Sequence, residues 1–400
     1  MIQIETTSHD PFFNQAFEDY VFRTFREDEV LLLWRNRPAV VVGCYQNICR
    51  EVHVRALLEQ NIPVVRRMSG GGTVYHDLGN LNYTLITGQS GALDYDRCLA
   101  PVLRALNALG VPAQKSRTCD MTVDGKKISG SAQKIANGRV LHHGTLLFDA
   151  DLTRLDEITT GRKNDAFCSK GTQSAICAVM NLRPYLREDC EIVTFARQLA
   201  QKILPPGAKT VRLTQAQLAD VRRLAADLYQ SWDWTWGKTP AFTYEKTAEF
   251  AGRPIRVRYE ARHGLIRNAA VQSDAIDAAR ASALLEGARL DPALFLDVCR
   301  ALAGERAAEL FDIFCKPNGG ETMEKQLVMP KLQPEMQSGV LCAWLKNEGE
   351  EIHKGEALYE IETDKVVNQI EATEDGILRR QLCEEGDSVA VLTPVAIVET

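Results

Sequence analysis

Three kinds of feature are missing from this 400-residue sequence. No apolar run approaches the ~20 residues that a helix needs to cross a bilayer. The N-terminus lacks the basic-then-apolar order of a signal peptide. The eleven cysteines form neither a C-x-x-C pair nor a Cys/His cluster at zinc spacing. The sequence therefore argues against a membrane span, a thiolate metal site and a disulfide framework, and predicts a cytoplasmic protein.

Charge is distributed unevenly along the chain. Residues 324–400 hold 7 Lys+Arg and 16 Asp+Glu, a net charge of −9, while the whole chain carries −6. The remaining 323 residues therefore carry +3. An acidic segment joined to a mildly basic one is consistent with docking between them and equally with plain solubility. We expect no nucleic acid or membrane partner.

Composition shifts divide the chain into four parts. Residues 1–237 alternate strand and helix patterns and predict a mixed α/β sheet domain. Residues 238–316 read as a small α+β domain, with strands at 242–250, 255–259 and 265–271 followed by helical periodicity. Residues 317–323 form a short Pro/Asn/Gly-rich linker, and residues 324–400 read as an all-β module. In the first part we predict strands at 30–34, 39–43, 63–66, 73–76 and 81–86, and helices at 54–60 and 96–109.

A glycine-rich connection lies between two of these strands. Gly70, Gly71 and Gly72 follow Arg66, Arg67, Met68 and Ser69. Successive glycines can turn backbone N–H groups toward an anion, and two arginines add charge-assisted donors. The connection therefore predicts a phosphate or carboxylate site, with an ordinary tight turn as the alternative.

Two further segments carry candidate site residues. Asp124-Gly125 predicts a hairpin whose second strand carries Lys127. A later strand, at 139–148, has His142, His143 and Gly144 in its middle, and a glycine inside a strand often marks close approach of a ligand. Together with the triple-glycine connection, these segments predict a pocket for two negatively charged partners.

The C-terminal module contains an internal repeat with an offset of 37 residues. Gly339, Leu345, Gly349, Ile352, Leu358 and Ile361 reappear as Gly376, Leu382, Gly386, Val389, Val395 and Val398. Each half reads as short alternating strands separated by Gly, so the module is expected to be a flattened β-barrel of two quasi-repeats. Lys365, in Glu362-Thr363-Asp364-Lys365-Val366, falls at the hairpin between the halves.

Residues 324–400 resemble the lipoyl domain of 2-oxo-acid dehydrogenase acyltransferases. In that family the lysine of a similar Asp-Lys turn carries lipoic acid in amide linkage, which implies that Lys365 is a lipoyl attachment site. A biotinyl domain would show Met-Lys-Met, whereas Lys365 is flanked by Asp364 and Val366. The remaining alternative, an unmodified solvated turn, fits a lone Asp-Lys pair better than one inside this repeat.

Residues 1–315 resemble lipoate–protein ligases of the biotin/lipoate ligase family. The resemblance rests on residues 66–80 (RRMSGGGTVYHDLGN), 125–133 (GKKISGSAQ), 142–147 (HHGTLL) and 10–14 (DPFFN), and residues 240–315 look like the accessory domain of that family. It implies that ATP and Mg²⁺ activate lipoate to lipoyl-AMP, which then acylates a lysine. The acceptors implied are lipoyl domains of 2-oxo-acid dehydrogenase complexes, the glycine cleavage H protein, and the chain's own C-terminal module.

The resemblance also implies roles for individual residues. Lys127 would contact both the lipoyl carbonyl and the adenylate phosphate, with Asp120 at the adenylate end. The lipoate and ATP site would further include Arg67, Ser69, Gly70, Gly71, Gly72, His76, His143 and Gly144. For each histidine, a hydrogen-bonded core residue is the alternative. No metal-ligating protein residue is predicted.

The sequence departs from this family at three places. Cys44 replaces an arginine, the pair Cys119-Asp120 replaces Asn-Asp, and two arginines of the adenylate-covering loop are Ile176 and Ala178. Two other functions therefore stay open. One is an ATP-independent octanoyl or lipoyl transferase acting through a Cys119 thioester, whose thiolate Lys127 would favour. The other is a non-catalytic lipoyl carrier or scaffold.

Overall fold

The computed structural model describes residues 1–88, 95–116, 119–159, 167–169, 178–315, 324–332, 336–363 and 366–399. The chain separates into two compact units, Met1–Pro317 and Asn318–Thr400. Each unit is considered by itself. No helix among these residues is long and apolar enough to cross a membrane.

The first unit is built on a mixed eight-stranded sheet formed by its described residues. Three neighbouring strands at one edge are parallel, and the others pair antiparallel. The strand order is β12 (Thr210–Arg212), β1 (Ile2–Glu5), β2 (Val30–Trp34), β6 (Asn80–Gly88), β10 (Arg139–Leu147), β9 (Lys126–Ala136), β8 (Asp120–Val123) and β7 (Gln114–Ser116). The mixed-sheet prediction is confirmed.

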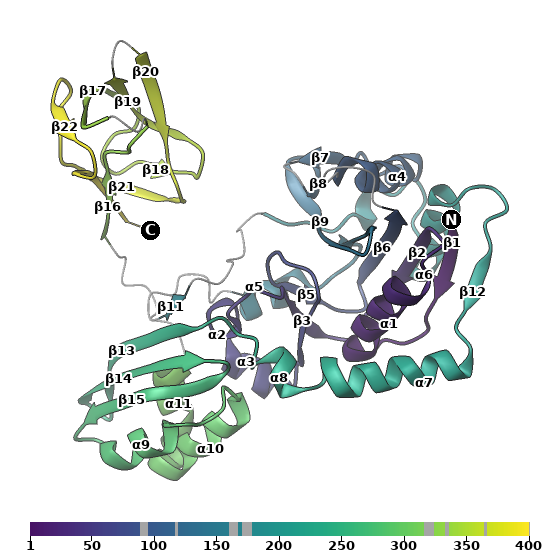
Figure 1. Cartoon of the computed structure of the whole chain (residues 1–400), viewed down its shortest axis with the longest axis horizontal. Helices are drawn as coiled ribbons and strands as arrows, with labels where there is room; N and C mark the ends of the chain where they lie inside the picture. Colours follow the sequence, from purple (N-terminus) through teal and green to yellow (C-terminus); the bar gives the residue numbers. More distant parts are fainter. Residues whose placement is uncertain are drawn as a thin grey trace. The chain divides into compact units, whose positions relative to one another are not determined.

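Helices cover both faces of this sheet (Figure 1). On one face, Val30 and Leu32 of β2 pack with α1 (Pro11–Thr24), α7 (Gln215–Leu224) and the π-helical turn at Ala225–Tyr229. On the other, Leu31 packs with α4 (Tyr95–Ala108) and α6 (Ile192–Ile203). Successive residues of a strand point to opposite faces, so a run of apolar residues is buried on both sides. We call the first face the α1 face.

A smaller three-stranded sheet carries the glycine-rich connection. Its order is β4 (Val64–Arg66), β3 (Ala39–Val42) and β5 (Val74–His76). The connection runs from β4 to β5, as the sequence predicts. Short helices lie beside this sheet: α2 (Ile48–Glu51), α3 (Val54–Glu59) and α5 (Leu152–Thr159).

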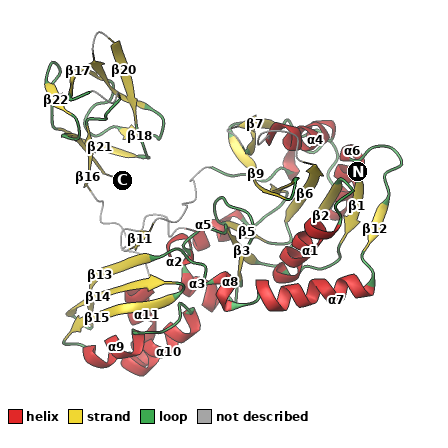
Figure 2. Ribbon diagram, viewed as in Figure 1, coloured by secondary structure: helices red, strands yellow, loops and turns green. Residues whose placement is uncertain are grey.

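The accessory segment is a second sheet backed by helices (Figure 2). Strands β11 (Phe167–Ser169), β13 (Phe242–Phe250), β14 (Arg253–Arg262) and β15 (Leu265–Ser273) pair in that order. The helices are α9 (Ala278–Leu285), α10 (Pro292–Ala303) and α11 (Ala307–Cys315), and α8 (Trp232–Thr235) directly precedes β13. Every second residue of β14 from Ile255 to Ala261 is buried, so one face of the sheet is the core face.

This segment shares its core with the small sheet. Val40, Val42 and Val64 belong to the same apolar cluster as Tyr244 and Tyr259 of the accessory strands. That shared core places residues 1–317 in one compact unit. The sequence boundary at residue 237 therefore marks a change of sheet within one unit, and as a domain limit it stays a prediction.

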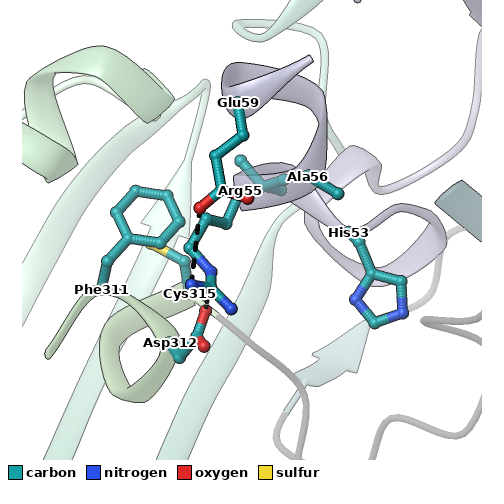
Figure 3. A pocket seen from close by; sticks show the side chains of 8 residues that line it. His53, Arg55, Ala56, Glu59, Phe311, Asp312 and Cys315 are labelled. Atoms are coloured by element: carbon teal, nitrogen blue, oxygen red, sulfur yellow. Dashed lines mark ion pairs between the residues drawn. The ribbon is translucent and has the colours of Figure 1, made fainter. Parts of the chain in front are cut away.

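A cavity lies where α3 meets α11 (Figure 3). It encloses about 400 Å³ of empty space, part of it open to solvent. Arg55 crosses it, with its guanidinium 2.9 Å from Asp312 and 3.5 Å from Glu59. None of the residues predicted for the ligand site lines it. The cavity therefore lies between two helices and apart from the predicted site.

The second unit contains two four-stranded sheets among its described residues. One has the order β16 (Glu324–Val328), β23 (Pro394–Glu399), β21 (Gly376–Gln381) and β18 (Glu351–Ile352). The other has the order β20 (Val366–Glu371), β19 (Ala357–Thr363), β17 (Ser338–Trp344) and β22 (Ser388–Ala390). The prediction of an all-β module is confirmed.

Backbone hydrogen bonds reproduce the 37-residue repeat. The Gly349 N–H donates to the Leu378 carbonyl at 2.6 Å, and its counterpart Gly386 donates to Leu341 at 2.7 Å. Likewise Leu345 donates to Leu358 at 2.9 Å and Leu382 to Val395 at 2.8 Å. In the leucine pair both partners are shifted forward by 37 residues, within one half. In the glycine pair each bond runs from one half to the other, so the donor moves forward and the acceptor back by 37 residues. This exchange relates the two halves by an approximate two-fold arrangement.

The hairpin between the halves is formed by β19 and β20. Their pairing extends to Thr363 opposite Val366. Asp364 and the predicted attachment residue Lys365 lie outside the described residues.

Positive backbone φ angles in the second unit allow a test of its turn geometry. Leu392 has φ +68° with a side chain 71% exposed, whereas Gly386 has φ +96° with open space where a Cβ would stand. A left-handed conformation costs a non-glycine residue about 1–2 kcal/mol. Leu392→Gly should therefore stabilise this unit by about 1 kcal/mol, and Gly386→Ala should destabilise it by a similar amount. Hydrogen exchange of β17 and β21 amides in the full chain measures both changes in stability. If the two substitutions changed stability in the same direction, this explanation would be wrong.

Candidate functional site

Two glycines from different segments meet at the glycine-rich connection. A Cβ on Gly43 would lie 2.1 Å from the carbonyl oxygen of Gly71, which itself has φ +87°. The Cys44 N–H also donates to the Ser69 carbonyl at 2.9 Å. Residues 43–44 and 69–71 therefore lie in direct backbone contact, which excludes any side chain at Gly43.

Arg67 holds the connection from inside. Its guanidinium donates to the carbonyls of Gly70 at 2.5 Å and Gly72 at 2.8 Å, and to the Ser69 hydroxyl at 3.0 Å. The side chain is buried, and burial lowers the pKa of Arg67 to about 10. It remains charged at neutral pH. The sequence pointed to Arg67 as an anion donor, whereas in the structure backbone carbonyls of the loop itself occupy its donors.

Arg66 is buried completely and points the other way. Its guanidinium donates to five oxygens, those of the Gly43, Cys44, Gln46 and Thr235 carbonyls and the Thr239 hydroxyl. Burial lowers its pKa to about 10. Arg66 therefore joins the loop after β3 to the segment around α8. This internal role explains why a second arginine precedes the glycines, which sequence reasoning read as another anion donor.

A chain of hydrogen bonds runs from α1 to the glycine-rich connection. Ser69 Oγ lies 2.6 Å from His143 Nε2, and His143 Nδ1 lies 2.9 Å from both carboxylate oxygens of Glu18. The Thr84 hydroxyl donates to the same carboxylate at 2.6 Å. Sequence reasoning missed Glu18. Its one signal is a glutamate among the apolar residues of α1, where a buried carboxylate requires partners.

The other predicted histidine lies beside this chain. His76 is buried, its Nδ1 is 3.1 Å from Asn36 Nδ2, and its ring meets Trp34 edge-on at 6.1 Å between centroids. Burial, reinforced by the charge of Arg67, lowers the pKa of His76 to about 3. The ring is therefore neutral at physiological pH.

Gly144 faces a protein side chain. A Cβ there would lie 2.5 Å from the hydroxyl of Tyr83, which is opposite Gly144 in the β6–β10 pairing. Burial raises the pKa of this tyrosine. The glycine inside the strand was expected to mark close approach of a ligand. Instead, the Tyr83 ring crosses it beneath α4, so Gly144 contributes space for the core.

Lys127 and Asp120 form an ion pair on neighbouring strands. Lys127 Nζ lies 2.8 Å from Asp120 Oδ1, with the lysine side chain 25% exposed. The predicted hairpin at Asp124-Gly125 is present, with φ values of +49° and +75°. It joins β8 to β9 and thereby brings the two charged groups together.

The amine and the glycine-rich connection lie on the same face of the sheet. A Cβ on Gly130 would approach Lys127 Nζ, and a Cβ on Gly71 would lie 3.8 Å from Ala132 Cβ. Gly130 and Ala132 are two residues apart on β9, so they point to one face. Ala132 pairs with His143, which contacts Glu18 of α1. This is the α1 face, and it carries Lys127, Asp120, Ser69, His143 and the triple-glycine connection.

Two of the positions where the sequence departs from the family contact predicted site residues: Cys44 donates its backbone N–H to Ser69, and the Ala178 carbonyl accepts from Lys127. Tyr45 is 67% exposed and its ring lies near the Cβ position of Gly70. The backbone of Lys127 pairs with the C-terminal part of the predicted adenylate-covering loop: its N–H donates to the Ala178 carbonyl, and its carbonyl accepts from the Met180 N–H. Ile176 lies outside the described residues.

Comparison with known proteins identifies the family. Residues 10–204 match the family described as "Lipoyl protein ligase A/B catalytic domain", and residues 325–398 match "Biotin-requiring enzyme". Lipoate-protein ligase LplJ of Bacillus subtilis is 32% identical over 302 residues, covering 72% of this chain and 90% of that protein. The chain belongs to the lipoate–protein ligase family. Lipoate–protein ligase 1 of Staphylococcus aureus is 34% identical over 271 residues, 66% of this chain and 82% of its own.

The ligase fold recurs in solved structures. P. falciparum LipL1 in complex with lipoate has a TM-score of 0.50 at 20% identity, covering 78% of this chain and 98% of that one. The putative lipoate protein ligase Ta0514 of T. acidophilum has the same TM-score at 22% identity, covering 59% and 98%. At these identities the likeness concerns the fold.

The neutral histidines of this ligase predict a specific sensitivity to acid. Burial lowers the pKa of His142 to about 3 from 6.5. A lowered folded-state pKa means stability that is present above pH 6.5 and is lost as pH falls toward 3. At pH 5 the loss is about 2 kcal/mol for one such histidine. In urea titrations at pH 7 and pH 5, His142→Asn should reduce the acid-induced loss by this amount, while the exposed-site control His263→Asn should not. Equal losses in both variants would contradict the account.

Proposed function

We propose that this ligase activates lipoate with ATP and transfers the lipoyl group to a lysine of lipoyl domains. In the first step a carboxylate oxygen of lipoate bonds to the α-phosphorus of ATP, and pyrophosphate leaves. In the second, a lysine amine bonds to the acyl carbon and loses a proton, and AMP leaves. The first step is needed because a free carboxylate is a poor electrophile.

The position of Lys127 and the glycine-rich connection on the α1 face is the observation that supports this proposal. Both substrates are anions, and Lys127 places its ammonium on the face that the glycine-rich connection borders. Charge that develops at the acyl oxygen and the phosphate requires a preorganised donor in a site of limited water access. The names of the relatives at 32% and 34% identity support lipoate as the acid.

The contacts support a proposed role for each site residue. Lys127 would leave Asp120 for the lipoyl carbonyl and the phosphate, and Asp120 would then face the incoming amine. Arg67, through Ser69, Gly70 and Gly72, shapes the connection beside the ligand. The set Gly71, His76, His143 and Gly144 completes the predicted site, with Gly144 acting through Tyr83. Mg²⁺ would arrive with ATP, and Asp120 is the carboxylate next to the Lys127 amine.

The thioester alternative is disfavoured by the surroundings of Cys119. Burial raises the pKa of its thiol, and the neighbouring Asp120 adds to the shift more than Lys127 opposes it. The thiol therefore stays protonated at neutral pH, whereas a nucleophilic cysteine needs the thiolate. The Lys127–Asp120 ion pair and the glycine-rich connection hydrogen-bonded by Arg67 favour an enzyme over a non-catalytic scaffold.

The second unit supports a proposal about the acceptor. A lipoyl module on the same chain, joined by residues 317–323, would meet the site at an effective concentration of millimolar order. We therefore propose Lys365 as an acceptor, together with lipoyl domains of 2-oxo-acid dehydrogenase complexes and the glycine cleavage H protein.

Lipoate-dependent exchange of labelled pyrophosphate into ATP tests the activation step. Lys127→Ala should lower this exchange about 100- to 1,000-fold, because it removes the donor at the reacting groups. Lys126→Ala, one residue away on the hairpin, is the matched control and should retain it, as should Lys365→Arg. Absence of pyrophosphate exchange in the chain without substitutions would favour the thioester transferase or the scaffold.

Mixing two variants tests whether the chain modifies itself. Lys127→Ala lacks the activating amine but keeps Lys365, and Lys365→Arg has the reverse pattern. If transfer occurs within one chain, neither variant in a dilute mixture should acquire a lipoyl mass increment at residue 365. The labelling rate per molecule of the chain without substitutions should then be independent of its concentration. Rapid labelling of the Lys127→Ala chain would instead demonstrate transfer between chains.

A further inference from the structure

Gly130 occupies a position where the backbone does not require glycine. It lies within β9, opposite Asp120 of β8. Unlike Gly71 or Gly125, it does not have a positive φ. A glycine inside a strand weakens the strand and adds no packing. The reason for a glycine here must therefore lie in the side chains around it and not in the backbone conformation.

The reason lies in what a side chain would meet. A Cβ built on Gly130 lies 2.8 Å from Lys127 Cε and 2.9 Å from Lys127 Nζ, and 3.5 Å from Asp120 Oδ1. These are the reactive end of the lysine and its ion-pair partner. The space that Gly130 leaves open is thus occupied by the Lys127 amine.

Lys127 cannot avoid such a side chain by moving its backbone. Its N–H donates to the Ala178 carbonyl at 2.8 Å, and its carbonyl accepts from the Met180 N–H at 2.9 Å. With the Cα fixed between these bonds, only the flexible end of the side chain can shift. A methyl group at position 130 would therefore displace the amine and leave the strands in place.

We propose that Gly130 is a positioning residue for the Lys127 amine, holding open the path along which the amine moves between Asp120 and the acyl phosphate. The proposal rests on the ligase function proposed above. It accounts for a glycine whose role is neither a turn nor a close backbone approach.

Gly130→Ala tests this, with Gly88→Ala as the matched control. Gly88 ends β6, has no positive φ, and has open space at its Cβ position. Gly130→Ala should lower kcat for pyrophosphate exchange by about 100-fold, the size of loss that a misplacement of ~1 Å produces. Its thermal midpoint should equal or exceed that of the unmodified chain, because alanine suits a strand better than glycine. Normal kcat, or a kcat loss matched by unfolding, would overturn the proposal.

A double-mutant cycle separates a positioning role from a general effect. The probe is lipoyl sulfamoyl adenosine, in which a sulfamate replaces the phosphate, and its affinity is measured by calorimetry. Gly130→Ala should weaken binding by about tenfold when Lys127 is present and leave it unchanged in a Lys127→Ala chain. Equal weakening in both backgrounds would show that Gly130 acts independently of the lysine.

Chemical labelling gives a readout that does not depend on the reaction. With limiting acetic anhydride and no substrate, the ratio of Lys127 to Lys126 acetylation should rise severalfold in Gly130→Ala and stay constant in Gly88→Ala. A constant ratio in both would contradict the displacement. Failure of exchange in the unmodified chain, with this ratio changed as expected, would count against the ligase function and leave the positioning intact.

Discussion

Two buried guanidinium groups, those of Arg66 and Arg67, determine how the rest of the site is arranged. A charge removed from water is tolerated only when its donors are satisfied, and here backbone carbonyls satisfy them. The carbonyls of residues 43, 44, 46, 70 and 72 must therefore turn toward the arginines. The loops take their shape from this requirement, and the contact of Gly43 with Gly71 follows from it. Loss of either guanidinium would leave several carbonyls unpaired at once.

A second chain of polar side chains, packed against the two arginines, organises the α1 face. Glu18 fixes His143, His143 meets Ser69, and Ser69 accepts a hydrogen bond from Arg67. Helix α1, strand β10 and the glycine-rich connection are thereby coupled through side chains that are all buried. Opposite this frame, the Lys127 amine sits against Asp120 over an open glycine position.

Much of this architecture could be predicted because local sequence patterns determine it. The strand predicted at 30–34 agrees with β2 and that at 242–250 with β13, since apolar periodicity determines both. The hairpin before Lys127 and the 37-residue repeat are likewise encoded by glycine placement. Contacts between distant segments were harder to foresee. Nothing near Glu18 in the sequence indicates His143, 125 residues away, and nothing near Gly144 indicates Tyr83. The direction of the two arginines was misjudged because an arginine next to glycines resembles an anion site, whether its donors face a ligand or the loop.

We propose that the α1 face binds the acyl-adenylate with Lys127 at its reacting centre. A crystal structure of the full chain with lipoyl sulfamoyl adenosine tests it most directly. We expect the analogue to lie beside residues 69–72, with Lys127 Nζ moved from Asp120 to within hydrogen-bond distance of both the acyl oxygen and the sulfamate. An analogue bound elsewhere, or one bound here while Lys127 keeps its ion pair with Asp120, would contradict it.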